Sequence, residues 1–332
     1  MISVLIPTIN DTELGDTLKL LRETTEYSSD VEIIIINDGG DIPNCDLQNG
    51  KLINNGKNWG VGYSFDRGAK HAKGDIIIIM GSDVRPRHGW HKKVFNTVSN
   101  NPGILGCAVS VGLNPKRMNM EDKGCFRRYG ADLLFTVSED DLPEKSALRG
   151  KEGGYTALFK GKWKHGKEND SPYEIPCLMG AFYFTSKDYY FKLHGWDTEE
   201  GNPWCGHRYW SGLEPHISLK SWLHGGGCML YPDIEAGHVF ARLRRSRRYR
   251  HGLRSAEWMW WNSLWTLETM ILDADLRKKL YDFPIPELNL GKAKKMIKDH
   301  YSEVERIRER NRQEFKYDHT IFTDRFGYEF NF

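Results

Sequence analysis

The 332-residue sequence has no apolar run approaching the roughly twenty residues that a membrane-spanning helix needs. Met1 leads directly into a strand-like segment, without the charged stretch and cleavage site of a secretory signal. The six cysteines include no C-x-x-C pair, which argues against a zinc knuckle or a redox motif. We therefore expect a cytoplasmic protein whose thiols are reduced and mostly buried.

An internal repeat is also absent, as is a linker long enough to separate independent domains. Hydrophobic residues make up 39% of the chain, which is enough to bury a large core. The formal net charge is only +2, but its distribution is uneven. No acidic residue occurs between Ala241 and Ser255, a segment that holds seven arginines. The composition is therefore that of a globular protein with one strongly basic segment.

The N-terminal part of the chain alternates between short aliphatic runs and amphipathic stretches. The runs 3–7, 31–36 and 75–80 are continuous in their apolar residues, which is typical of strands covered on both faces. The stretches 14–25 and 60–72 lie between them and have helical periodicity. This order predicts an α/β fold with a doubly wound parallel sheet, in which ligands bind beyond the carboxyl ends of the strands.

Polar or glycine-rich turns follow each of these runs. Asp38 and Asp83 are candidate ligand contacts because of their positions in these turns. Each also has a simpler explanation, since an aspartate after a strand commonly closes a turn or caps a helix. The turns are Pro7-Thr8-Ile9-Asn10, Asn37-Asp38-Gly39-Gly40 and Gly81-Ser82-Asp83.

The second half of the chain carries several short motifs between residues 179 and 240. In chain order they are Met179-Gly180-Ala181, Gly195-Trp196-Asp197, Trp210-Ser211-Gly212-Leu213-Glu214 and Gly237-His238-Val239-Phe240. With the turns of the first half, they resemble the motifs of family 2 and related GT-A glycosyltransferases, and most closely those of the polypeptide N-acetylgalactosaminyltransferases. Several motifs in register are more specific than any one of them alone.

The resemblance implies a GT-A domain at residues 1–255, with a nucleotide-binding half at about 1–112 and a sugar and acceptor half at about 150–255. Its sheet is mostly parallel and flanked by helices. Residues 256–332 are expected to form a helical C-terminal extension packed on this domain, in which 291–315 reads as one charged helix.

The implied donor is a UDP-sugar, with GalNAc, GlcNAc or Glc as the sugar. Asp38 falls where the relatives read the uracil ring through its imide N3 proton. Phe65 replaces an arginine of the family, and Arg67 is the nearby residue that can take over its phosphate contact. The expected donor contacts are Pro7, Thr8, Asp38, Arg67, Ser82, Asp83, Gly180 and Ala181.

A divalent cation, Mn2+ or Mg2+, is part of the same resemblance. The spacing to Gly89-Trp90 aligns Asp83 with the direct metal ligand of the family, and Gly81 with an aspartate that this chain lacks. The Gly-His-Val-Phe motif identifies His238 as a second ligand. A carboxylate and an imidazole suit such an ion.

Glu214, Asp197 and Trp210 are the catalytic candidates. Glu214 falls at a helix start where the family has an acidic pair that contacts the donor sugar or activates the acceptor hydroxyl. Ser211 and Glu214 also have the S-x-x-E spacing of a capping box, which is a structural alternative. Asp197 is expected to hold sugar hydroxyls, with a turn aspartate as its alternative. The resemblance implies retention of configuration, whereas a base at Glu214 would suit inversion.

The arginine segment follows the last motif, where the relatives have a loop that closes over the donor. Because two arginines suffice for a diphosphate, the surplus predicts a polyanionic acceptor. We expect DNA with a hydroxyl-bearing base, in the host cytoplasm if the protein is viral. The alternatives are bacterial envelope glycan synthesis at an anionic membrane, a non-catalytic binding module, and a solvated basic loop without a ligand. The arginines assigned to the acceptor are Arg242, Arg244, Arg245, Arg247 and Arg248.

Overall fold

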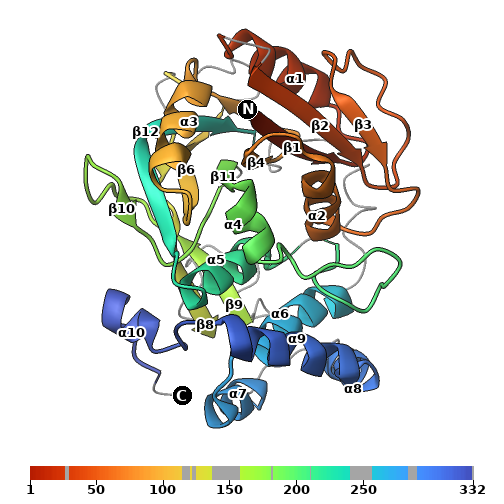
Figure 1. The fold of residues 1–332 in the computed structure, drawn as a ribbon, viewed down its shortest axis with the longest axis vertical. Helices are drawn as coiled ribbons and strands as arrows, with labels where there is room; N and C mark the ends of the chain where they lie inside the picture. Colours follow the sequence, from red (N-terminus) through yellow and green to blue (C-terminus); the bar gives the residue numbers. More distant parts are fainter. Residues whose placement is uncertain are drawn as a thin grey trace.

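The computed structural model describes residues 1–26, 30–113, 120–121, 125–136, 158–180, 182–209, 211–239, 256–282 and 290–330. Figure 1 shows a central sheet flanked by helices, with the C-terminal helices grouped below it. This is the α/β arrangement with C-terminal helices that the sequence predicts. Among the described helices, none is long and apolar enough to cross a bilayer.

Within the described residues, ten strands form one sheet with the order β10-β12-β6-β11-β4-β1-β2-β3, while β5 pairs with β12 and β7 with β6. Strands β1 to β4 pair in parallel, and β11 runs antiparallel between β4 and β6. Strands β8 and β9 form a separate pair. The bounds are β1 Ile2–Thr8, β2 Val31–Asn37, β3 Lys51–Asn54, β4 Ile76–Met80, β5 Val84–Pro86, β6 Leu105–Gly112, β7 Arg127–Arg128, β8 Ala131–Thr136, β9 Leu158–Trp163, β10 Tyr173–Glu174, β11 Phe182–Ser186 and β12 Cys228–His238.

The helices follow the sequence prediction in the first half and depart from it near the end. The expected helices at 14–25 and 60–72 are confirmed as α1 and α2. The single helix expected at 291–315 is wrong, because His300 stacks on Trp204, with ring centroids 3.8 Å apart, and separates α8 from α9. The bounds are α1 Leu14–Glu23, α2 Val61–His71, α3 Trp90–Asn100, α4 Lys187–Lys192, α5 Leu213–Leu223, α6 Ala256–Met270, α7 Ala274–Tyr281, α8 Leu290–Asp299, α9 Tyr301–Glu314 and α10 Ile321–Phe326.

Helices cover both faces of the sheet because successive strand residues point to opposite sides. Val4 and Ile6 pack in an apolar cluster with α1 and α3. Leu5 packs on the other face, in a cluster with α2, α5 and the C-terminal helices. The C-terminal helices therefore share one core with the sheet. Four of the six cysteines are buried, as expected.

A buried carboxylate, that of Asp197, ties the C-terminal helices to the second half of the sheet domain. Its fully buried side chain lies 2.7 Å from the Lys220 ammonium of α5 and 2.5 Å from the Arg310 guanidinium of α9. The Trp265 indole of α6 donates a hydrogen bond to it. Burial opposes the charged form, but Lys220 and Arg310 hold the pKa of Asp197 well below its usual range. Side chains from three segments thus meet at one buried carboxylate.

We predict that Asp197→Asn lowers the free energy of unfolding by about 3–5 kcal/mol, because it leaves the buried Lys220 and the partly buried Arg310 without their counter-charge. Chemical denaturation followed by circular dichroism measures this loss. The matched control is Glu309→Gln, which removes one partner of the exposed Arg312–Glu309 pair, and whose expected cost is below about 1 kcal/mol. Equal losses in the two variants would contradict the prediction.

A second prediction concerns His224, the residue that follows the last turn of α5. The residue is 2% exposed, and neither ring nitrogen has a hydrogen-bond partner within the described part of the chain. Burial lowers the pKa of His224 to about 3. In the unfolded chain the pKa of His224 returns to about 6.5, so the unfolded chain binds a proton at a pH where the folded chain does not. This contribution to stability is therefore present above that unfolded pKa and is lost as the pH falls toward the folded pKa.

Between about pH 7 and about pH 5, the wild type should lose about 2 kcal/mol more stability than His224→Leu does. Urea titrations of both proteins at intermediate pH values measure the difference. Parallel pH profiles for the two proteins would show that His224 is already charged in the fold.

Candidate active site

The parallel strands β1, β2 and β4 bring their carboxyl ends to one edge of the sheet. Thr8 lies opposite Asn37 in the pairing of β1 with β2, and the Asp38 amide donates to the Thr8 carbonyl over 2.8 Å. Pro7 precedes this contact in β1, and Gly81, Ser82 and Asp83 follow β4. The turns that the sequence singled out in the first half therefore lie beside one another.

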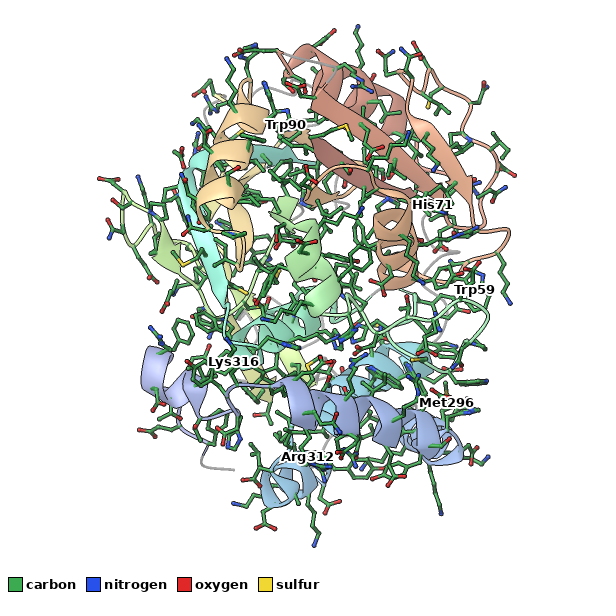
Figure 2. All side chains as sticks on the ribbon, in the orientation of Figure 1. Trp59, His71, Trp90, Met296, Arg312 and Lys316 are labelled. Carbon is green, nitrogen blue, oxygen red and sulfur yellow. The ribbon has the colours of Figure 1, made fainter. Side chains whose placement is uncertain are left out.

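The carboxylate of Asp38 holds the loop that leads into α2. It accepts hydrogen bonds of 2.9 Å from the amides of Trp59 and Gly60 and from the Asn55 side chain. Burial raises the pKa of Asp38, although these hydrogen bonds oppose the rise. Trp59 lies at the edge of the molecule, beyond the start of α2 (Figure 2). The Ser64 side chain also favours the charged form of Asp38.

The turn after β2 is closed by Asn37 rather than by Asp38. The Asn37 side chain accepts a hydrogen bond from the Gly40 amide and donates one to the Gly40 carbonyl. The simpler explanation offered for Asp38 therefore applies to its neighbour. The contact of Asp38 with uracil stays a prediction.

Arg67 supports this loop. Its guanidinium donates to the Asn54 carbonyl and, over 2.8 Å, to Asn55 Oδ1, the side chain that also binds Asp38. Phe65 is buried against Trp196, with ring centroids 5.1 Å apart. Both side chains are thus engaged within the protein, and a phosphate contact for Arg67 stays a prediction.

Asp83 and His238 meet at the junction of the two halves. Strand β5 begins directly after Asp83 and pairs antiparallel with the end of β12, where His238 lies opposite Val84. His238 Nε2 is 3.1 Å from Asp83 Oδ2, and the side chains are 19% and 14% exposed. A carboxylate and an imidazole at this separation form a donor pair that suits a divalent cation such as Mn2+.

The neighbours of this pair are held by other carboxylates. Ser82 donates a hydrogen bond to Asp11, which clamps the loop after β1 to the end of β4. Arg85, in β5, lies 2.9 Å from Glu13. Arg87 pairs with Glu121 and with Glu235. The two arginines that follow Asp83 are therefore neutralised within the protein.

Glu214 lies in the first turn of α5 and does not form the capping box. The N-cap position is Gly212, in the left-handed conformation at φ 62°, and no side chain caps the helix. Glu214 instead accepts a hydrogen bond of 3.1 Å from the hydroxyl of Tyr183. Burial raises the pKa of this half-buried carboxyl, against the lowering effects of its own amide, of Tyr183 and of the imidazole of His238. The site thus holds, close to His238, a carboxyl group whose pKa is above its ordinary value.

The remaining predicted residues divide between the core and the segments outside the description. Asp197 is fully buried among Lys220, Arg310 and His216, so no sugar hydroxyl reaches it in this conformation. This arrangement favours the structural alternative for Asp197. Gly180 has a φ of 124° and precedes β11. Outside the described residues lie Trp210, Ala181, Arg242, Arg244, Arg245, Arg247 and Arg248.

Two contributors, Asn55 and Tyr183, were missed by sequence reasoning. Asn55 follows β3 as Asp38 follows β2, so the same rule of polar residues after strands would have found it. Tyr183 gives no comparable signal, because an aromatic residue inside an apolar strand is commonly a core residue. Its hydroxyl acquires a role only through its distance from Glu214.

Comparison with known proteins agrees with this geometry. Residues 3–149 match the model of Glycosyl transferase family 2. A putative polypeptide N-acetylgalactosaminyltransferase 9 of Drosophila melanogaster is 22% identical over 233 residues, which are 67% of this chain and 32% of that protein. Polypeptide N-acetylgalactosaminyltransferase 11 of Xenopus tropicalis is 23% identical over 195 residues, covering 58% of this chain and 28% of the relative. The chain thus spans about a third of the length of these relatives.

Solved structures give the same fold. GalNAc-T7 with UDP, GalNAc and Mn2+ superposes with a TM-score of 0.59 at 18% identity, covering 91% of this chain and 54% of that chain. S. aureus TarS 1–349 with UDP-GlcNAc superposes with a TM-score of 0.50 at 13% identity, covering 90% and 72%. The chain therefore has the GT-A glycosyltransferase fold and resembles the catalytic domain of the polypeptide N-acetylgalactosaminyltransferases, and its residues 3–149 match the Glycosyl transferase family 2 model.

Proposed function

We propose that the protein transfers a sugar from a UDP-sugar to a hydroxyl acceptor with the help of one divalent cation. The pairing of Asp83 with His238, close to Glu214 and beyond the strand ends that carry Asp38, is the observation that carries the proposal. The uridine would lie against Pro7, Thr8 and Asp38. The sugar would lie toward Gly180 and Ala181, next to the start of α5.

Asp83 and His238 would hold the cation. When bound, such an ion offsets the negative charge that develops on the departing diphosphate. The imidazole favours Mn2+ over Mg2+, which prefers oxygen ligands and retains several waters. GalNAc-T7, whose fold this chain shares, was solved with Mn2+. The chain has Gly81 at the position of the other expected acid, so the diphosphate would have to supply oxygen ligands.

Glu214 would contact the reacting groups. Its half-buried carboxyl and raised pKa suit a side chain that holds a hydroxyl of the donor sugar or of the acceptor. Under retention of configuration, which the resemblance favours, the departing phosphate takes the acceptor proton and Glu214 orients the sugar. Under inversion, Glu214 itself would accept that proton.

The proposed acceptor follows from the arginine segment. A modified base in DNA rests on the arginines at 242–254, which lie outside the described residues. The support is their number and charge alone. Envelope or capsule glycan synthesis would use the same arginines at an anionic lipid surface.

The metal assignment gives the first functional prediction. Asp83→Asn and His238→Gln should each weaken Mn2+-dependent UDP binding by at least about tenfold, because losing a direct ligand costs no less than losing a residue that orients one. Isothermal titration calorimetry of UDP, with and without Mn2+, measures this effect.

Two variants away from the pair serve as controls. Asp75→Asn changes a 91% exposed carboxylate before the opposite end of β4, and His88→Gln removes a 65% exposed imidazole. Both should bind UDP as the wild type does. If Asp83→Asn and His238→Gln keep full metal-dependent affinity, the cation is held elsewhere and the assignment falls.

The acceptor gives the second functional prediction. Replacing Arg244, Arg245, Arg247 and Arg248 by Gln should raise the KM for a polyanionic acceptor and leave UDP-sugar hydrolysis by water nearly unchanged. Wild-type binding to duplex DNA should weaken steeply with salt, and the quadruple variant should flatten the log–log slope by up to about 3.6. Fluorescence anisotropy with labelled DNA measures the slope.

The same variant separates the alternatives. Salt-insensitive or absent DNA binding, together with arginine-dependent binding to vesicles of anionic lipid, would replace the DNA acceptor by envelope glycan synthesis. Loss of donor affinity with retained acceptor affinity would assign the arginines to the diphosphate. Absence of UDP release from every UDP-sugar tested would favour the non-catalytic module.

A further inference from the structure

Tyr183 lies in the middle of the sheet, in a strand to which the motifs assign no function. In β11 it is opposite Ile79 of β4 on one side and Cys107 of β6 on the other. Only 6% of the residue is exposed. Its hydroxyl nevertheless reaches two segments that the site uses, because it is 2.5 Å from the Gly180 carbonyl oxygen and 3.1 Å from Glu214 Oε1.

The Tyr183 hydroxyl has a single hydrogen to donate, so the Gly180 carbonyl and Glu214 compete for it. A carbonyl and an ionised carboxylate can only accept a hydrogen bond, whereas a phenol can donate one and accept others. The shorter contact indicates that the hydroxyl donates mainly to the Gly180 carbonyl. The position of Glu214 is therefore coupled to the turn before β11, since displacing either acceptor changes the hydrogen bond that the other receives.

Tyr183 is also the side chain on which the orientation of Glu214 depends. Within the described residues, no lysine or arginine forms an ion pair with Glu214, and Tyr183 is its side-chain hydrogen-bond donor. The other titratable side chain that acts on Glu214 is His238, from β12. Glu214 in turn raises the pKa of the buried thiols Cys107 and Cys177.

We propose that Tyr183 is a positioning residue that holds the carboxylate of Glu214 in register with the Gly180 turn. The inference rests on the proposed function, in which Glu214 contacts the reacting groups. It assigns to Tyr183 an effect on turnover and none on UDP affinity, because Asp38, Asp83 and His238 lie on other strands or turns.

The test compares Tyr183→Phe with Tyr189→Phe. Each variant loses one hydroxyl from a buried ring. The Tyr189 hydroxyl lies 2.9 Å from that of Ser221, which is in the last turn of α5, whereas Glu214 is in the first. UDP release from a UDP-sugar, with water as acceptor and Mn2+ present, gives kcat and KM, and calorimetry gives the UDP affinity.

Tyr183→Phe should lower kcat by about 10- to 100-fold, the scale expected when a reacting group moves by about 1 Å. Its UDP affinity should stay within about twofold of the wild type, and Tyr189→Phe should change kcat by less than about twofold. In a Glu214→Gln background, Tyr183→Phe should add no further loss, because both changes disrupt one unit.

Other results would each overturn a particular proposal. An unchanged kcat in Tyr183→Phe, or an additive loss in the double variant, overturns the positioning role while the transferase proposal stands. A loss of UDP affinity equal to the loss of kcat makes Tyr183 a structural residue of the donor site and overturns it as well. A wild type that releases no UDP from any UDP-sugar overturns both proposals.

Discussion

Asp83 and His238 meet because β5 pairs antiparallel with the end of β12, and the Val239 amide donates to the Asp83 carbonyl across the same junction. This pairing joins a loop of the first half to the last strand of the second half. It also requires Gly237, since a Cβ there would lie 2.6 Å from the Leu113 side chain. Packing therefore explains the glycine of the Gly-His-Val-Phe motif, and the proposed cation site would explain the histidine beside it.

Two buried carboxylates hold the turn at 195–198 from opposite sides, and their electrostatics differ. Asp66, in α2, accepts hydrogen bonds from the Tyr190 hydroxyl and from the Trp196 amide, and burial raises its pKa. Asp197 faces two cations, which lower its pKa. Neutral donors thus anchor the turn to α2, while ion pairs anchor it to α5 and α9. The negative charge of Asp197 is therefore compensated inside the fold.

The sequence was sufficient for features that depend on local pattern. The aliphatic runs predicted β1, β2 and β4, and the rule of strand ends located Asp38 and Asp83. The Gly-His-Val-Phe motif located His238, and the structure places it against Asp83. These features share one cause, which is that each side chain concerned is fixed by the strand that it follows or ends.

The sequence was insufficient where distant segments decide. Gly195-Trp196-Asp197 reads as a sugar-binding motif, but a Cβ on Gly195 would lie 1.9 Å from Asp66 Oδ1, and Trp196 packs on Phe65. Asp197 forms ion pairs with Lys220 and Arg310. The periodicity of the sequence does not predict partners that lie so far along the chain. The break at His300 is of the same kind, because Trp204 lies far away in the chain.

The link between Asp197 and Arg310 has a consequence for the order in which the protein can be completed on the ribosome. Arg310 follows Asp197 by 113 residues, so at about 5–20 residues per second it is synthesised roughly 6 to 23 s later. Lys220, only 23 residues away, is available much sooner. A nascent chain can therefore assemble the sheet and the neutral Asp197–Lys220 pair first, and the turn before α5 gains its link to α9 only when Arg310 has been synthesised.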